Sequence, residues 1–235
     1  MDEELERLLE EQKTYYRERA PEYDQVYFRE GPHDRGPEFN ARWFRETKAL
    51  EAAVEGFAPT GRVLELACGT GLWTRYLVRT ADELTAVDAA PEVIELNRER
   101  VDDPRVRYEV VDLFSWEPEG RFDSIFFGFW LSHVPPDGFD DFWRRLATWL
   151  EPSGRVLFVD DRSPLAWEER HSSHADDDPV ARRRLADGRE FRIVKAFYAP
   201  EQLAGRLAEI DWRAETHGTG EFFLYGSAVP NGPRR

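Results

Sequence analysis

The feature that most constrains the fold of this chain is an apolar segment that runs into a glycine turn, Val63-Leu64-Glu65-Leu66-Ala67-Cys68-Gly69-Thr70-Gly71-Leu72-Trp73-Thr74. The pattern predicts a strand, a tight turn and the first residues of a helix. Gly69 and Gly71 allow the backbone to turn sharply and to lie close to a ligand, where a Cβ atom would clash. Such a turn at the carboxyl end of a parallel strand is typical of a site for a nucleotide-like ligand.

The residues around this turn distinguish several kinds of nucleotide site. A dinucleotide site has a third glycine that allows close packing of helix on strand, and here Thr74 stands at that position. No lysine follows the turn, so a P-loop is excluded. Glu65, at the end of the strand, would instead place a carboxylate in the crevice. A carboxylate there suits a cationic ligand that carries an ammonium or sulfonium group.

Two more acidic residues follow the next two apolar segments. Asp88 ends one of them, and it comes about 20 residues after Glu65, the spacing of an acid that binds ribose hydroxyls. Asp112 follows the other. Each has a structural alternative, Asp88 as a cap of the helix that begins at Pro91 and Asp112 as an ordinary turn residue. The repetition at three successive strand ends favours a shared ligand site.

Apolar segments alternate with helical ones through the middle of the chain, which is typical of a doubly wound parallel sheet. We expect strands at 62–67, 84–88, 105–110, 122–128 and 154–160, and helices at 71–80, 91–101 and 137–150. The segment 162–188 is polar and irregular. A strand at 190–198, a helix at 200–210 and a strand at 214–226 are expected to close the sheet.

At these residues the chain resembles the class I S-adenosylmethionine (SAM)-dependent methyltransferases of the small-molecule type. Their motif is an acid followed by a glycine-rich turn, E/D-x-G-x-G-x-G, and Glu65, Gly69 and Gly71 match it, while Ala67 replaces the first glycine. The resemblance implies an α/β, Rossmann-like, seven-stranded and mostly parallel sheet with an antiparallel last strand. It implies one domain over 1–235, made of an N-terminal helical lid (1–55), a SAM-binding core (56–161) and an acceptor-side insertion with the closing strands (162–235).

The resemblance also assigns the donor site. In the family, the residue at the position of Glu65 binds the methionine ammonium. The residues at the positions of Asp88 and Ala89 bind the ribose with its neighbouring groups, and those at the positions of Asp112 and Leu113 bind the adenine. Phe129 ends the fourth strand, in a turn that the family lines with backbone carbonyl groups facing the methionine part.

The N-terminal segment resembles the lid of small-molecule members, in which a tyrosine and an arginine contact the carboxylate of the donor. Tyr16 and Arg19 would take these roles, because they lie three residues apart on one helical face. A surface helix with aromatic contacts to the core explains the same spacing. Tyr27 and Trp130 are expected to line the acceptor site.

His133 follows the fourth strand, where donor and acceptor should meet. Its ordinary pKa suits proton removal near neutral pH, so it is the candidate catalytic base. The alternative is structural, a histidine that caps a helix or stabilises the turn at Val134–Pro136. Many methyltransferases rely on positioning alone, without a base.

Other polar clusters do not predict a metal site. His171 and His174, with Asp176–Asp178, have the residue types of metal ligands, but their polar neighbours favour a solvated loop. Asp160 and Asp161 lack the companion acid and asparagine of metal-dependent catechol methyltransferases. Cys68 lies inside the turn without a partner base. We therefore expect SAM, with S-adenosylhomocysteine as its product, and no metal.

Composition limits the partners. The net charge of −15 repels phosphate backbones, so nucleic acid is not an expected substrate. No apolar run is long enough to span a membrane, the acidic N-terminus is unlike a signal peptide, and the single cysteine forms no internal disulfide, so we expect a cytoplasmic protein. Its expected oligomeric state is a monomer or a homodimer. The expected reaction is methyl transfer to an O, N or S atom of a small molecule. Two alternatives remain, a SAM-binding regulatory protein without activity and a nicotinamide-dependent oxidoreductase.

Overall fold

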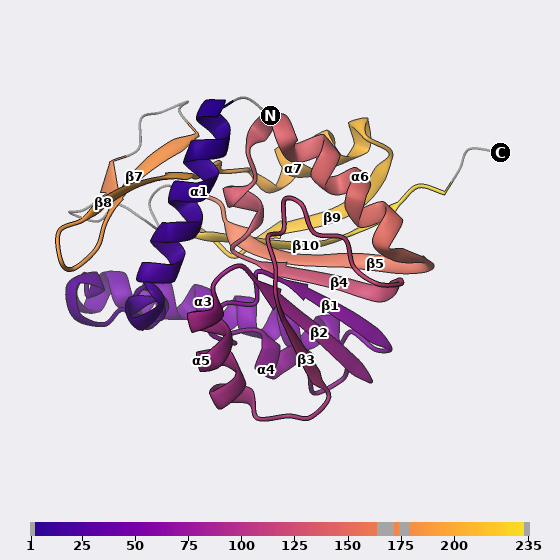
Figure 1. Cartoon of the computed structure of the whole chain (residues 1–235), viewed down its shortest axis with the longest axis horizontal. Helices are drawn as coiled ribbons and strands as arrows, with labels where there is room; N and C mark the ends of the chain where they lie inside the picture. The colour runs from indigo at the N-terminus through magenta and orange to yellow at the C-terminus, as the bar shows by residue number, and fades with distance from the viewer. Residues whose placement is uncertain (1–2, 164–171, 174–178, 233–235) are drawn as a thin grey trace.

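The centre of the computed structural model, which describes residues 3–163, 172–173 and 179–232, is one large β-sheet (Figure 1). Its strands are β1 (Arg62–Leu66), β2 (Glu83–Asp88), β3 (Val106–Val110), β4 (Phe122–Gly128), β5 (Leu150–Asp161), β9 (Trp212–Gly218) and β10 (Phe223–Pro230). They lie in the order β3-β2-β1-β4-β5-β10-β9. β1 to β5 pair in parallel, and β10 pairs antiparallel with both of its neighbours. The expected seven-stranded, mostly parallel sheet with an antiparallel last strand is confirmed.

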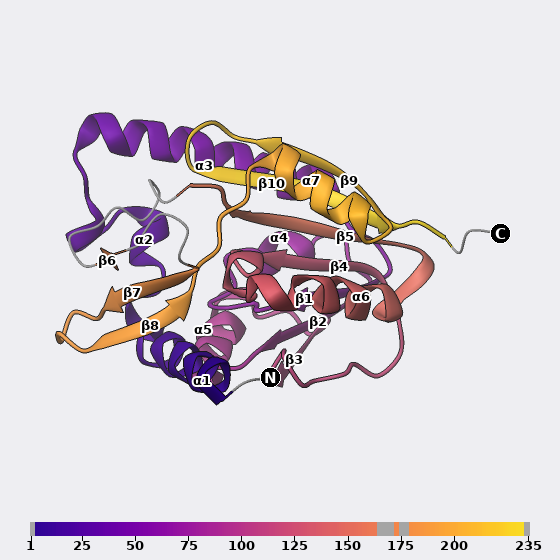
Figure 2. The same ribbon diagram turned by 90° about the horizontal axis from the view of Figure 1, so that it is seen from above.

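Helices cover both faces of this sheet (Figure 2). On one face, α6 (Phe139–Trp149) and α7 (Pro200–Glu209) share a hydrophobic core with Ile125 and Phe127 of β4. On the other, α3 (Pro37–Phe57) and α4 (Thr74–Leu77) pack with Phe126, and α5 (Pro91–Val101) contacts β2, β3 and α4. Successive side chains of a strand point to opposite faces, so a strand covered on both sides is a continuous apolar run.

The closing part of the sheet differs from the prediction. The expected strand at 214–226 is two strands, β9 and β10, because the turn at Gly218-Thr219-Gly220 interrupts it. The expected helix at 71–80 is also shorter, since Gly71 (φ 86°) belongs to the preceding turn and α4 begins only at Thr74.

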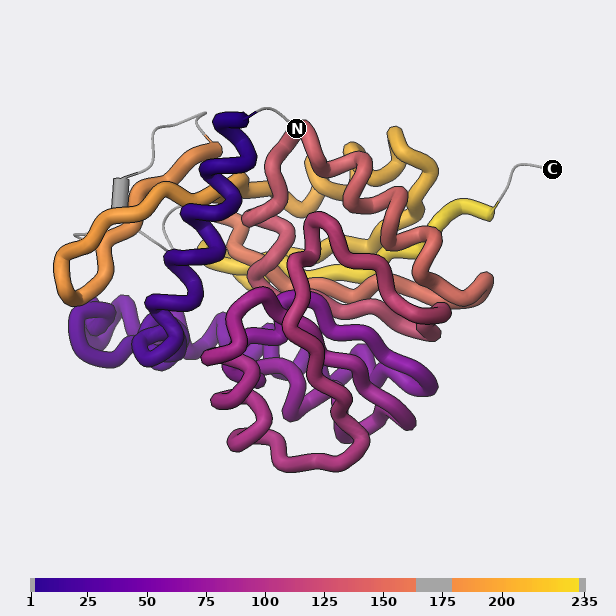
Figure 3. Tube along the Cα trace, in the orientation of Figure 1, coloured from indigo at the N-terminus to yellow at the C-terminus, as the bar shows by residue number. Residues whose placement is uncertain are grey.

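A second, 3-stranded antiparallel sheet was not predicted. It consists of β6 (Ser172–Ser173), β7 (Val180–Arg184) and β8 (Glu190–Val194), so the strand expected near 190–198 belongs here and not to the main sheet. α1 (Glu3–Glu18) lies beside β8, although the two are far apart in sequence (Figure 3). β7 is hard to recognise in the sequence because the alternation of buried and exposed residues falls on three consecutive arginines, Arg182-Arg183-Arg184. Of these only Arg183 is buried.

Short helices connect the N-terminal segment to the sheet. η1 (Ala20–Glu22), α2 (Gln25–Phe28) and η2 (Gly31–His33) join α1 to α3, and η3 (Leu131–His133) and η4 (Pro136–Gly138) follow β4. α3, which the sequence placed in the lid, buries Trp43, Leu50 and Val54 in the core. In the described ranges no helix combines the length and the apolar character needed to cross a membrane.

Candidate active site

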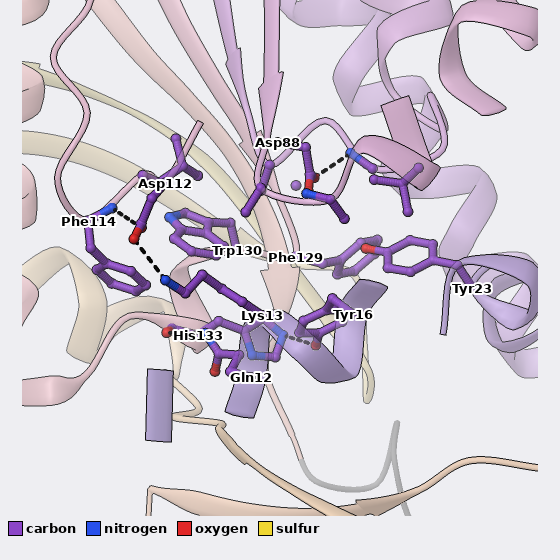
Figure 4. Close-up of a pocket in the computed structure, with 17 residues that line it drawn as sticks. Gln12, Lys13, Tyr16, Tyr23, Asp88, Asp112, Phe114, Phe129, Trp130 and His133 are labelled. Atoms are coloured by element: carbon purple, nitrogen blue, oxygen red, sulfur yellow. Dashed lines mark hydrogen bonds and ion pairs between the residues drawn. The ribbon is translucent and has the colours of Figure 1, made fainter. Parts of the chain in front are cut away.

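A cavity opens beside the carboxyl ends of β1, β2 and β4 (Figure 4). α1 contributes Gln12, Lys13 and Tyr16 to its wall. Most residues predicted for the site line this first cavity: Tyr16, Ala67, Gly69, Asp88, Ala89, Asp112, Leu113, Phe129, Trp130 and His133. Sequence reasoning did not single out Gln12 or Lys13, since nothing in their spacing separates them from the other polar residues of a surface helix.

The backbone is strained where two strands end at this cavity. Ala67 after β1 has φ 51° and Phe129 after β4 has φ 58°, both in the left-handed region. That conformation costs a residue with a Cβ atom about 1–2 kcal/mol. At Ala67 it explains why the family's motif has glycine, because glycine adopts positive φ without this cost. Both of these residues line the cavity, which indicates that the shape of its wall requires positive φ at the two positions.

Asn97 of α5 holds the glycine turn in place, and sequence reasoning missed it. Its buried side-chain amide donates to the carbonyl oxygens of Cys68 (3.3 Å) and Gly69 (3.2 Å) and to Thr74 Oγ1 (2.9 Å). A Cβ atom on Gly71 would lie 2.6 Å from Asn97 Oδ1, so the turn packs against Asn97 without room for a side chain. Thr74, at the position of a third glycine, therefore takes part in the hydrogen bonds by which Asn97 holds the turn.

Asp88 links the turn to the next helix. Its Oδ2 accepts the Gly69 N–H and its Oδ1 the Ala90 N–H, each at 3.0 Å. Burial raises the pKa of Asp88, and these backbone hydrogen bonds oppose that shift. Each carboxylate oxygen keeps a second lone pair, so the group can still accept hydroxyl donors from the cavity.

Asp112, after β3, faces the same cavity and already has two partners. Its Oδ1 accepts the Phe114 N–H at 3.0 Å, and Lys13 Nζ donates to Oδ2 at 2.9 Å (Figure 4). Burial opposes the charge of Lys13, but its hydrogen bonds with Glu10 and Asp112 outweigh that effect and raise its pKa. The lid helix is thereby tied to the residue expected at the adenine.

Glu65 and Gly71 line neither this cavity nor the second one described below. Glu65 is 1% exposed, and its Oε2 has no hydrogen-bond partner among the described residues. Burial raises its pKa to about 8, while a hydrogen bond with Thr74 opposes the shift and the charge of Asp88 adds to it. In this structure Glu65 is buried and is linked by its hydrogen bond to Thr74, at the end of the glycine turn.

A second cavity lies against the first. The two share Tyr16, Tyr23, Phe129 and His133 as a common wall. The remaining lining residues are Arg19, Asp24, Val26, Tyr27, Trp43, Leu72, Asp161 and Phe223. Tyr27 is thus on the side expected for the acceptor, whereas Trp130 lines only the first cavity and Arg19 only the second.

Both ring nitrogens of His133 are occupied. Nδ1 lies 2.7 Å from the Val194 carbonyl oxygen, and Nε2 lies 2.7 Å from Tyr16 Oη. Burial lowers the pKa of His133 well below its ordinary value, and the charges of Lys195 and Arg183 act in the same direction. The ring of His133 lines both cavities, but neither of its nitrogens is left without a partner to act on a ligand.

A buried ion pair anchors the chain after β8 next to His133. Lys195 Nζ donates to Asp161 Oδ2 (2.7 Å) and to Ser132 Oγ (2.9 Å), and the Ser132 N–H donates to Asp160 Oδ2 (3.0 Å). Burial raises the pKa of Asp160 to about 6, which Lys195 opposes and Asp161 reinforces. Asp160 and Asp161 thus form part of a lysine-centred network.

The sequence also offered a histidine–aspartate cluster and a single cysteine as candidates for chemistry. His171, His174 and Asp176–Asp178 lie outside the described residues, and within the described ranges no group of acidic, histidine and cysteine side chains has the arrangement of a metal site. Cys68 is buried, and burial raises its thiol pKa well above the ordinary value, so it is not a nucleophile.

Comparison with known proteins places this geometry in a family. A model of the methyltransferase domain matches residues 63–154. The solved DhpI–SAH complex is 36% identical, with a TM-score of 0.75, over 97% of this chain and 98% of that one. A DhpI–SAM–HEP complex gives 36% identity and a TM-score of 0.74 over 95% and 98% of the two chains.

A more distant relative is the ubiquinone biosynthesis O-methyltransferase of Xanthomonas axonopodis pv. citri (strain 306). It is 32% identical over 124 residues, which are 50% of this chain and 51% of that protein. This chain thus spans about half the length of that relative. From the near full-length match to DhpI and the matched domain, the chain belongs to the class I SAM-dependent methyltransferases.

Proposed function

We propose that this protein transfers the methyl group of SAM to an O, N or S atom of a small molecule. The observation that carries the proposal is the common wall of the two cavities, formed by Tyr16, Tyr23, Phe129 and His133. A donor in the first cavity and an acceptor in the second would meet at that wall. Holding both reactants in line supplies much of the rate enhancement in such a transfer.

The first cavity fits SAM. The free lone pairs of Asp88 can accept both ribose hydroxyls, and Asp112 with Leu113 can hold the adenine. SAM brings a methyl group that its sulfonium already makes electrophilic, so the protein needs to bind, orient and exclude water. DhpI, which is similar over nearly its whole length, was solved with SAM and with SAH.

The second cavity fits a small acceptor with an apolar or flat part. Tyr16, Tyr23, Tyr27, Trp43, Phe129 and Phe223 supply aromatic surface, and Arg19, Asp24 and Asp161 supply charge. A second cavity that shares a wall with the donor site favours an enzyme over a regulatory SAM-binding protein. The family assignment argues against the nicotinamide-dependent oxidoreductase.

Partners and location follow from composition alone. We propose that the substrate is not a nucleic acid, given the net charge of −15, and that the protein works in the cytoplasm. A monomer or a homodimer remains the prediction for its oligomeric state.

Calorimetry and turnover test the proposal. Titration with SAH should give saturable binding, and titration with NAD should give none. SAH formation from SAM is then measured with a panel of hydroxyl, amine and thiol acceptors. Binding of NAD in preference to SAH would reject the proposal, and SAH binding without turnover on any acceptor would favour the regulatory alternative.

A further inference from the structure

Three hydrogen bonds join His133, Gln12 and Val194 in a ring, and they determine the tautomer of His133. The Val194 N–H donates to Gln12 Oε1 (2.9 Å), and Gln12 Nε2 donates to the His133 carbonyl oxygen (3.4 Å). The Val194 carbonyl oxygen lies 2.7 Å from His133 Nδ1. A carbonyl oxygen can only accept, so Nδ1 must carry the hydrogen.

The surroundings of His133 keep the ring neutral. The side chain is 4% exposed, and Lys195, Arg183 and Arg19 all disfavour a positive charge on it. In a neutral ring with hydrogen on Nδ1, Nε2 carries a lone pair and can only accept. Tyr16 Oη, at 2.7 Å, must therefore be the donor of the bond to Nε2.

We propose that Tyr16 Oη accepts a hydrogen bond from an N–H or O–H group of a ligand at the common wall of the two cavities. A phenol has one hydrogen, which His133 receives, and the oxygen keeps lone pairs for another partner. Tyr16 lines both cavities, and its ring and that of His133 lie together beneath the first one (Figure 4). The proposal rests on the proposed function, because it names the chemistry that the same site selects.

This arrangement changes the role that the sequence suggested for Tyr16. A carboxylate has no hydrogen to donate, so Tyr16 Oη is unsuited to bind the carboxylate of the donor while it bonds to His133. Two groups have the required chemistry, the methionine ammonium of SAM and a hydroxyl or amino group of the acceptor. Both are hydrogen donors, and binding experiments separate them.

The tautomer can be measured in the unsubstituted protein. With 15N-labelled histidine, and with a His133→Gln variant to assign the signals, we expect His133 to carry hydrogen on Nδ1 and a bare Nε2 from pH 6 to 8. A hydrogen on Nε2 would overturn the inference, because Tyr16 would then be the acceptor of that bond and its own hydrogen would be available to ligands. This measurement needs no ligand.

The Tyr16→Phe variant identifies the donor group. SAH, decarboxylated SAH and 5′-methylthioadenosine share the nucleoside, the first two carry the ammonium, and only SAH carries the carboxylate. If Tyr16 accepts from the ammonium, the affinities of SAH and of decarboxylated SAH should both fall about tenfold and methylthioadenosine affinity should not change. If it accepts from the acceptor, all three affinities should persist, and KM for a hydroxyl or amine acceptor should rise about tenfold or kcat fall.

Tyr15→Phe is the matched control, since Tyr15 is a buried neighbour on α1 that lines neither cavity. Unchanged SAH affinity and unchanged turnover in Tyr16→Phe would overturn the inference. If the unsubstituted protein does not bind SAH, the proposed function is rejected. The tautomer measurement would still decide the direction of the hydrogen bond between Tyr16 and His133.

Discussion

Lys13 Nζ lies 2.9 Å from Asp112 Oδ2, so the N-terminal helix and the turn after β3 are joined across the first cavity. Their side chains are 21% and 37% exposed, which places the pair at the edge of the site. Because Lys13 and the adenine amino group are both hydrogen donors, they would share the oxygens of Asp112. If Asp112 binds the adenine, as we propose, the position of α1 and the binding of the donor are linked.

The ion pair should contribute a small and measurable coupling energy. In a double-mutant cycle with Lys13→Met and Asp112→Asn, we expect coupling of about 0.5–1 kcal/mol in the free energy of unfolding by urea. High salt should reduce it, because the pair is partly exposed. The helical i,i+4 pair Arg7–Glu3, 71% and 90% exposed, is the control and should show weaker coupling, about 0.3 kcal/mol. Equal coupling in the two pairs would contradict a specific role for Lys13.

SAH should protect the N-terminal segment from hydrogen exchange. α1 provides Gln12, Lys13 and Tyr16 to the cavity wall, so a ligand there adds contacts that hold the helix in place. We expect slower exchange over residues 10–30 and no change in α6, which lies away from the cavity. The same protection with and without SAH would show that the segment is already fixed.

Asp88→Ala should weaken SAH binding at least tenfold. The substitution removes the acceptors of the ribose hydroxyls, and hydrogen bonds to a charged group contribute about 1.5–3 kcal/mol each before water compensates. It also leaves the N–H groups of Gly69 and Ala90 without their acceptor, so Asp88→Asn, which keeps one oxygen, should lose less stability. Titration calorimetry with the exposed Asp141→Asn as control decides the matter, and unchanged affinity would refute the assignment of Asp88.

Glu65 should make the stability of the free protein fall as pH rises. Its pKa is about 8 in the folded state against an ordinary value of 4.5. Between these values the folded protein holds a proton that the unfolded chain has lost, so raising the pH favours unfolding. We expect wild type to lose about 2–4 kcal/mol relative to Glu65→Gln between pH 5 and 8. Parallel pH profiles in urea unfolding would mean that Glu65 is ionised in the folded state.

Local patterns in the sequence predicted the core of the fold. The continuous apolar strands, the glycine turn and the acids Asp88 and Asp112 are visible without a structure, because a parallel sheet covered on both faces needs apolar runs and its strand ends share one edge. The predictions were wrong where local signals mislead. A turn divides 214–226 into β9 and β10, and β7 is concealed by an arginine run.

Sequence patterns were sufficient to predict the main sheet, the glycine turn and the family. The side-chain pairings around the site depend on tertiary packing: Lys13 with Asp112, Asn97 with the turn, and Tyr16 with His133. The same packing places Arg19 at the second cavity and buries Glu65. These pairings join residues from segments far apart in the chain, and the direction of the bond between Tyr16 and His133 depends on a carbonyl of β8. No periodicity in the sequence encodes such contacts, because those of Lys13 and Tyr16 arise when α1 packs against β8, and those of Asn97 when α5 packs against β2 and α4.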